Sequence, residues 1–210
     1  MPTESTSVSK GELARRRILD AALKLIRQKG YAATRVEDIC DEAGMTKGGF
    51  FHHFKGKEDM AVAAAAHWSE VTGGLFDRAP YHEPADPYDR VLAYIDFRKQ
   101  ILQGGTADFT CLVGTLAQET HLTSPAIRDA AGESIFGHAA TLVPDIAAAK
   151  AERCPEADWT PESLAQFTQA VLQGAFILAK ASGGPDVARD MVDHLFRYVV
   201  MLLARDRQAA

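Results

Sequence analysis

The segment AGMTKGGFFHHF, residues 43–54, places several groups that bind anions or metals in one short stretch. Thr46 offers a hydroxyl, Lys47 an ammonium, and His52 and His53 two imidazoles. Hydroxyl and ammonium groups bind phosphate oxygens and base edges, and imidazoles also ligate metals. Adjacent helical residues project about 100° apart, whereas two metal ligands on one helix need a spacing of three or four. The spacing therefore argues against a metal site and favours hydrogen bonding to a polar partner.

Cys111, at the start of CLVGTLAQET, is a second chemical candidate. A thiol at a helix N-terminus has a stabilised thiolate, which can react with electrophiles or oxidants. A cysteine that only packs in the core is the alternative. A thiol hydrolase using Cys111 with His121 or His138 is a remote third hypothesis, because no nucleophile elbow, Walker loop or HExxH motif is present. With Cys40 and Cys154 the chain has three cysteines and no CxxC pair, so we expect neither disulfides nor a zinc knuckle.

The elements that must position these residues are helices. Apolar residues recur every three or four positions, and no alternating run indicates a strand, so the sequence predicts an all-α protein. Thr34 and Thr46 are expected to cap the second and third helices, with Glu37 reaching back to the start of the second. Gly30 ends the first helix and Gly44 turns the chain. The first four helices are expected over residues 10–29, 36–43 and 47–53 and from residue 57 onward.

Further start signals occur downstream, where Asp, Ser or Thr precedes Pro87, Pro125 and Pro161. Each pair predicts a helix that begins at its proline. A helix over residues 111–121 is expected after the loop GGTADF. The sequence Gly-Gly-Pro at residues 183–185 should precede a last helix that ends near residue 205.

Composition is that of an ordinary globular protein, with 210 residues, 47% of them hydrophobic and 24% charged. Residues 10–60 hold 11 Lys or Arg against 8 Asp or Glu, and the remainder holds 12 against 20. A slightly basic head on an acidic body is compatible with a polyanionic partner. No apolar run approaches the ~18 residues of a membrane span, and MPTESTSVSK lacks the apolar centre of a signal peptide. We therefore expect a cytoplasmic protein with no membrane partner.

Two short helices joined at Gly44, the second beginning with a hydroxyl cap and a lysine, form a helix-turn-helix pattern. The run RRRILDAALKLIRQKGYAATRVEDICDEAGMTKGGFFHHFKGKEDM, residues 15–60, strongly resembles the DNA-binding domain of the TetR family of bacterial one-component regulators. The resemblance implies a helix-turn-helix domain over residues 1–56 and a ligand-binding and dimerisation domain over residues 57–210. It implies a homodimeric repressor that a small-molecule inducer releases from a palindromic double-stranded DNA operator, without a cofactor and without enzymatic activity.

Site residues follow from the same resemblance. Helix N-termini present unpaired N–H groups to phosphates, and side chains on the third helix would face the major groove. The predicted DNA contacts are Thr34, Arg35, Thr46, Lys47, Gly48, Phe51, His52, His53 and Lys57. Phe51 departs from the family pattern, in which a tyrosine is more frequent and its hydroxyl reaches a phosphate. Phe50 and Phe54, four residues apart, are expected in the core.

Two adjacent glycines in a helix are unusual, because each costs about 1 kcal/mol relative to alanine. At Gly48, the absence of a side chain would allow close approach to DNA. Gly49 faces another direction, and its role would be to relieve crowding.

The body is expected to provide a ligand pocket and a dimer interface. The predicted pocket residues are Trp68, Phe97, Phe109, Cys111, Leu112, Leu116, Glu119 and Phe136. The acidic surplus of the body favours a cationic or neutral ligand. An alternative without a diffusible ligand is a thiol switch in which Cys111 senses oxidants or electrophiles.

The last two helices, residues 164–204, carry apolar stripes that include Phe167 and Leu178, and the small residues Ala170 and Gly174 would allow close helix approach. In the TetR family such helices form a four-helix bundle with a second subunit. The alternative is that these stripes only complete the core of one chain.

Overall fold

The computed structural model describes residues 9–204, and all regular structure in that range is helical, as the sequence predicts. The elements are α1 (Lys10–Lys29), α2 (Val36–Ala43), α3 (Lys47–His53), α4 (Lys57–Asp77), the 3-10 turn η1 (Pro80–His82), α5 (Pro87–Gln100), α6 (Thr106–Phe109), α7 (Leu112–Thr120), α8 (Pro125–Arg153), α9 (Pro161–Ser182) and α10 (Asp186–Leu202). Among the described helices, none is long and apolar enough to cross a membrane.

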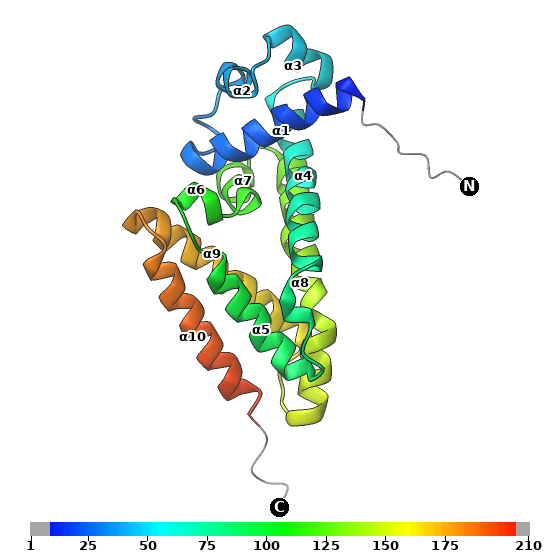
Figure 1. Cartoon of the computed structure of the whole chain (residues 1–210), viewed down its shortest axis with the longest axis vertical. Helices are drawn as coiled ribbons and strands as arrows, with labels where there is room; N and C mark the ends of the chain where they lie inside the picture. The colour runs from blue at the N-terminus through cyan, green and yellow to red at the C-terminus, as the bar shows by residue number, and fades with distance from the viewer. Residues whose placement is uncertain (1–8, 205–210) are drawn as a thin grey trace, which may run out of the picture.

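The N-terminal head consists of α1, α2, α3 and the first part of α4, at one end of the molecule (Figure 1). Its core contains fully buried Ile18 of α1, Ile39 of α2 and Phe50 of α3. Helices α2 and α3 form the helix-turn-helix. They meet at Gly44, whose φ of 64° lies in the left-handed region that favours glycine. The Thr46 hydroxyl then accepts a hydrogen bond from the backbone N–H of Gly49 at 3.1 Å and caps α3, as predicted.

The start of α2 differs from the prediction. Arg35, and not Thr34, occupies the N-cap position, and Asp38 rather than Glu37 reaches back, with its Oδ2 accepting from the Arg35 N–H at 3.0 Å. Thr34 is fully buried, and its hydroxyl donates to the Gly30 carbonyl at 2.7 Å. The predicted cap was wrong by one residue, because a threonine hydroxyl can satisfy a carbonyl four residues earlier as well as a helix N-terminus.

The body contains a second core, built mainly from η1, α5, α8, α9 and α10. The predicted starts at Pro87, Pro125 and Pro161 are confirmed, each preceded by a side chain that caps the new helix. Two details differ. Residues 106–109, expected in a loop, form the short helix α6, and the last helix ends at Leu202. The predicted end near Arg205 lies outside the described residues.

The head core also includes side chains from two helices of the body, α7 and α8. Leu112 and Leu116 of α7 and Ile127 of α8 are fully buried in the same cluster as the α1 core residues. Helix α4 leaves the head and runs beside α8 (Figure 1). The division of the chain at residue 56 stays a prediction, and α4 contributes side chains to both cores.

Candidate nucleic-acid interface and internal cavity

The outer face of α3 is exposed and polar except at one position. Lys47, Gly48 and His52 are exposed, and Phe51 has 54% of its surface accessible. Phe50 and Phe54 are buried, as the four-residue spacing predicts.

Lys47 is held by a contact within the head. Its ammonium pairs with the Glu37 carboxylate of α2, and both side chains are about half exposed. The hydrogen bond from Lys47 lowers the pKa of Glu37, so the carboxylate stays charged near neutral pH. Exposed ion pairs contribute little to stability, so Lys47 can exchange this partner for another anion.

Two more predicted basic contacts, Arg35 and Lys57 of α4, lie at the turn between α1 and α2. Arg35 is exposed at the N-terminus of α2, where its guanidinium bonds Asp38 at 2.9 Å and holds the pKa of that carboxyl well below its usual range. The Lys57 ammonium donates to the Ala32 carbonyl at 3.2 Å and lies 4.2 Å from the centre of the Tyr31 ring. Burial lowers the pKa of Lys57. Its role at a phosphate stays a prediction.

Thr34 cannot make the predicted phosphate contact. Its side chain has no accessible surface, and its hydroxyl and backbone N–H are bonded to Gly30 and Tyr31. The other eight predicted residues lie on α3, at its N-cap or at the N-termini of α2 and α4. His53 is half-buried, whereas His52 is exposed.

The two glycines of α3 differ in their surroundings. A Cβ built on Gly49 would lie 3.1 Å from the methyl group of Met45, which is tighter than ordinary contact. A Cβ on Gly48 would meet only the Thr46 hydroxyl, at 3.9 Å. A side chain at position 49 would therefore require the Met45 methyl group to move by a few tenths of an ångström, whereas one at position 48 would displace nothing within the chain.

A cavity of about 690 Å³ lies in the body between α4, α6, α8 and α9. Its wall is largely apolar and aromatic. The large residues on it are Trp68, Leu75 and Phe76 of α4, Phe109 of α6 and Phe176 of α9. Three predicted residues, Trp68, Phe109 and Cys111, line this cavity. A volume of this size and lining is typical of small-molecule sites.

The other five predicted pocket residues do not line the cavity. They are Phe97, Leu112, Leu116, Glu119 and Phe136. Phe97 packs against the rings of Phe76 and Tyr81 in the body core. Leu112 and Leu116 of α7 are fully buried against the head. Phe136 is 60% exposed, although its neighbours Ile135 and Gly137 line the cavity, because successive helical residues point about 100° apart.

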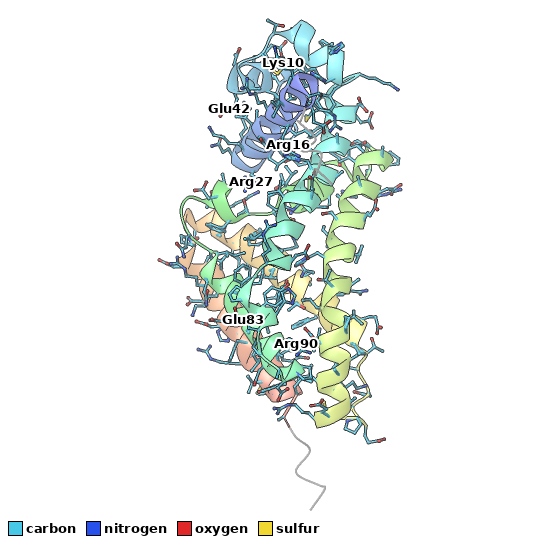
Figure 2. All side chains as sticks on the ribbon, turned by 45° about the vertical axis from the view of Figure 1, so that its right-hand side comes forward. Lys10, Arg16, Arg27, Glu42, Glu83 and Arg90 are labelled. Atoms are coloured by element: carbon cyan, nitrogen blue, oxygen red, sulfur yellow. The ribbon has the colours of Figure 1, made fainter. Side chains whose placement is uncertain are left out.

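Glu119 instead joins the body to the head. From the end of α7 its carboxylate accepts from the backbone N–H groups of Tyr31 and Ala32, at 3.1 and 2.7 Å. A second link is the Arg27 guanidinium of α1, which donates to the Asp108 carbonyl of α6 at 3.2 Å. Arg27 lies where the head meets the body (Figure 2).

One end of the cavity is polar, and the sequence prediction missed it. Arg98 of α5, His138 of α8 and Gln169 of α9 lie there together. Burial and the nearby Arg98 charge lower the pKa of His138 to about 3, so its ring is neutral at pH 7. Arg98 follows Val91, Tyr94 and Ile95 on the buried stripe of α5. This spacing in the sequence indicates that Arg98 shares the buried face of α5.

The structure does not place the Cys111 thiol in hydrogen-bonding contact with either histidine of the hydrolase hypothesis. The Cys111 Sγ caps α7 by accepting from the Gly114 N–H at 3.4 Å. His138 Nε2 is occupied by the Tyr94 hydroxyl at 2.9 Å. Between residues 9 and 204, no hydrogen bond joins Cys111 to His138 or to His121.

A helix-turn-helix head with an exposed second helix, mounted on a helical body that contains a cavity, is typical of helix-turn-helix transcriptional regulators. Residues 18–64 match the description "Bacterial regulatory proteins, tetR family", and residues 87–195 match "Tetracyclin repressor-like, C-terminal domain". The chain belongs to the TetR family of bacterial transcriptional regulators.

Individual relatives agree with this assignment. The transcriptional regulator AcuR of Cereibacter sphaeroides is 28% identical over 178 residues, which cover 83% of this chain and 80% of AcuR. The transcriptional repressor KstR2 of Rhodococcus jostii is 42% identical over 76 residues, 36% of this chain and 33% of KstR2.

Solved structures agree as well. A TetR regulator from Chloroflexus aurantiacus superposes with a TM-score of 0.77 at 26% identity, covering 91% of this chain and 96% of that one. A TetR regulatory protein from Rhodobacter sphaeroides gives 0.75 at 25%, covering 89% and 98%.

Proposed function

We propose that the protein is a homodimeric repressor that binds a palindromic operator through α3 and is released when a small molecule occupies the body cavity. The observation that carries the proposal is that α4 and α7 each contribute both to the head core and to the cavity wall. The name of KstR2 includes "repressor", which supports repression rather than activation. The site of action would be the cytoplasm, where bacterial DNA lies.

Helix α4 is the more direct of the two connections. Its first turns place Met60, Ala61 and Ala64 in the head core, fully buried. Further along, Trp68 and Phe76 of the same helix line the cavity. An occupant that moves the cavity part of α4 therefore also acts on the packing that orients the head.

Helix α7 is the second connection. Cys111 and Val113 at its start line the cavity, and Glu119 near its end binds the turn before α2. An effector needs only to bind two arrangements of the head unequally. A hundredfold preference shifts that equilibrium by about 2.7 kcal/mol.

The dimer would form through α9 and α10, which pack against each other along one flank of the body (Figure 1). These helices expose five large apolar side chains, Phe167, Ile177, Leu178, Tyr198 and Met201. The rings of Phe167 and Tyr198 lie 5.0 Å apart, so the patch spans both helices. An exposed apolar patch of this kind is typical of a protein interface, and the exposure of these residues argues against the alternative that they only complete one chain's core. Two-fold symmetry would place two copies of α3 on one operator.

Selection of bound fragments from the source genome tests the proposal. We expect a palindromic sequence to be enriched, because a symmetric dimer reads two half-sites. Affinity for that sequence should fall steeply as salt rises, since several phosphates are contacted. Absence of any enriched sequence, or affinity that does not change with salt, would contradict the proposal.

Cys111 supports a second candidate function, a thiol-sensing repressor, because its thiol lies on the cavity wall at the start of α7. In this variant of the mechanism an electrophile or oxidant modifies the thiol and releases DNA. Replacement Cys111→Ser tests it. If oxidant still releases the variant from DNA as it releases the unaltered protein, the thiol mechanism is wrong.

A further inference from the structure

Arg98 is a buried cation on the cavity wall. Only 8% of its surface is accessible, and it lies on the inner stripe of α5 with Tyr94 and Ile95. Removing a guanidinium from water is costly unless a carboxylate or a full set of hydrogen bonds replaces the solvent. The partners of Arg98 therefore decide what this end of the cavity can bind.

Those partners are few and neutral. The Nη1 of Arg98 donates to the Tyr94 hydroxyl oxygen at 3.3 Å and lies 3.4 Å from His138 Nε2. Its buried Nε has no hydrogen-bond partner. Across residues 9–204, no ion pair within 4.0 Å includes Arg98, whereas Arg90, two turns earlier on α5, pairs with Asp145 at 2.8 Å.

The surrounding network cannot supply the missing acceptor. The Tyr94 oxygen accepts from Arg98 and from Gln169 Nε2, at 3.2 Å in the second case, so its own proton is directed to His138 Nε2. His138 then carries its ring proton on Nδ1 and stays neutral, since burial and the Arg98 charge both lower its pKa. Every group in the network is neutral except Arg98.

Aromatic rings cover the cation without neutralising it. The Arg98 Cζ lies 5.1 Å from the ring centre of Phe76, 5.9 Å from Tyr94 and 6.0 Å from Phe176. Cation–π contacts offset part of the lost hydration but offer no acceptor to the free N–H groups. The cation is therefore stabilised in place while part of its hydrogen-bonding capacity remains unused.

The cavity wall also carries two carboxylates, Asp108 and Glu133, and neither contacts Arg98. Asp108 of α6 accepts from the Gly105 N–H at 2.8 Å and lies beside Arg27. Glu133 precedes His138 by five residues on α8, about 7.5 Å along the helix axis. Neither carboxylate pairs with Arg98, so the polar end of the cavity is positive.

We propose that the cavity binds a small organic acid, with its carboxylate paired to Arg98 and its apolar body against the aromatic wall. The forked guanidinium can offer two of its N–H groups to the two carboxylate oxygens. This inference rests on the proposal that the cavity is the effector site. It replaces the expectation of a cationic or neutral ligand, which used the charge of the whole body rather than that of the cavity.

Matched probes test the ligand class. The chain has two tryptophans, so Trp159→Phe leaves Trp68 on the cavity wall as the only indole. Its fluorescence would be titrated with decanoate, 1-decanol and decylamine, and with 4-phenylbutyrate and its alcohol and amine counterparts. We expect each acid to bind at least tenfold more tightly than its alcohol, with the amine weakest. Equal or tighter binding of the alcohol or amine, or no saturable binding of either acid, would overturn the proposal.

Replacement Arg98→Met removes the charge and keeps a long apolar side chain. In the variant, the ratio of acid affinity to alcohol affinity should fall at least tenfold. Its melting temperature should equal or exceed that of the unaltered protein, because an incompletely paired cation has been removed. Arg90→Met is the control, and it should bind the acids normally. If Arg98→Met binds acids as the unaltered protein does, or melts well below it while keeping the preference, Arg98 is structural and the proposal is wrong.

Operator binding separates this inference from the function on which it rests. The unliganded protein and Arg98→Met should bind the selected operator with equal affinity, and the acid should release only the unaltered protein. Failure of both to bind any DNA would contradict the regulator proposal, whereas normal DNA binding without acid preference would contradict the ligand class alone.

Discussion

At the scale of single residues, Lys47 is the side chain whose removal bears most directly on DNA binding. Lys47→Ala removes an exposed ammonium at the start of α3 and leaves the buried core untouched. We expect operator affinity to fall by about 1–3 kcal/mol and the melting temperature to stay the same. Fluorescence anisotropy with labelled operator measures the loss. Lys24→Ala is a matched control in the same head, because Lys24 also pairs with a glutamate, Glu42, but lies on α1.

His138 predicts how stability depends on pH. Its pKa is lowered from 6.5 to about 3 by burial and by Arg98, so the unfolded chain binds the extra proton between these values. Stability from this group is complete above pH 6.5 and falls as the pH decreases, by about 1.4 kcal/mol per unit between pH 5.5 and 4. Urea unfolding across this range measures the slope. His138→Gln should show a shallower slope, and an unchanged slope would contradict a neutral buried ring.

Local signals explain which residue roles were predictable. The buried Phe50 and the Thr46 cap follow from spacing and residue type. The N-cap of α2 could not be predicted in this way. The Thr34 hydroxyl can bond either the N-terminus of α2 or the Gly30 carbonyl, and the packing of the head determines that it bonds the carbonyl. Arg98 lies on an apolar stripe, but a stripe does not reveal whether a carboxylate faces it from α8 or α9.

At the scale of elements, α7 connects the cavity to the head through the Glu119 carboxylate. Glu119→Gln replaces one oxygen with an amide donor that faces the Tyr31 and Ala32 N–H groups. We expect the unfolding free energy to fall by about 1 kcal/mol and these two amides to exchange hydrogen faster. Hydrogen exchange followed by NMR measures this. Glu156→Gln, an exposed glutamate in the loop before α9, is the control, and equal protection in both variants would contradict the link.

Element positions were largely predictable, because prolines, caps and glycines mark most helix starts and turns in this chain. The short α6 was missed, since its four residues follow two glycines and contain little periodicity. Its position depends on a distant contact, the Arg27 guanidinium on the Asp108 carbonyl. Such contacts between segments 81 residues apart are set by tertiary packing rather than by local pattern.

At the scale of the whole molecule, the exposed patch on α9 and α10 predicts the oligomeric state. Phe167→Glu with Met201→Glu places two charges on side chains that are 41% and 69% exposed. We expect a folded monomer in analytical ultracentrifugation and operator affinity at least a hundredfold weaker, because the two heads no longer bind as a unit.

Leu122→Glu is the control for this experiment. Leu122 is 85% exposed in the connection between α7 and α8, away from the patch. The control should remain a dimer. A dimer in the double variant would show that the interface lies elsewhere.

The architecture and the location of the cavity in the body followed from the sequence resemblance, but most of the cavity wall did not. Leu112 and Leu116 have the expected apolar character and yet face the head core, while Phe136 faces outward. Which side of a helix meets a cavity depends on where its neighbours pack, and an apolar residue fits a core and a pocket wall equally well.

Hydroxyl-radical footprinting of the protein on the operator selected from the genome tests directly whether a homodimer binds DNA through α3. A homodimer that reads DNA with α3 predicts two protected half-sites related by two-fold symmetry, separated by one helical turn or a multiple of it. Lys47→Ala should weaken protection of both half-sites equally. Protection of a single asymmetric site, or protection that Lys47→Ala leaves unchanged, would contradict DNA recognition by a homodimer through α3.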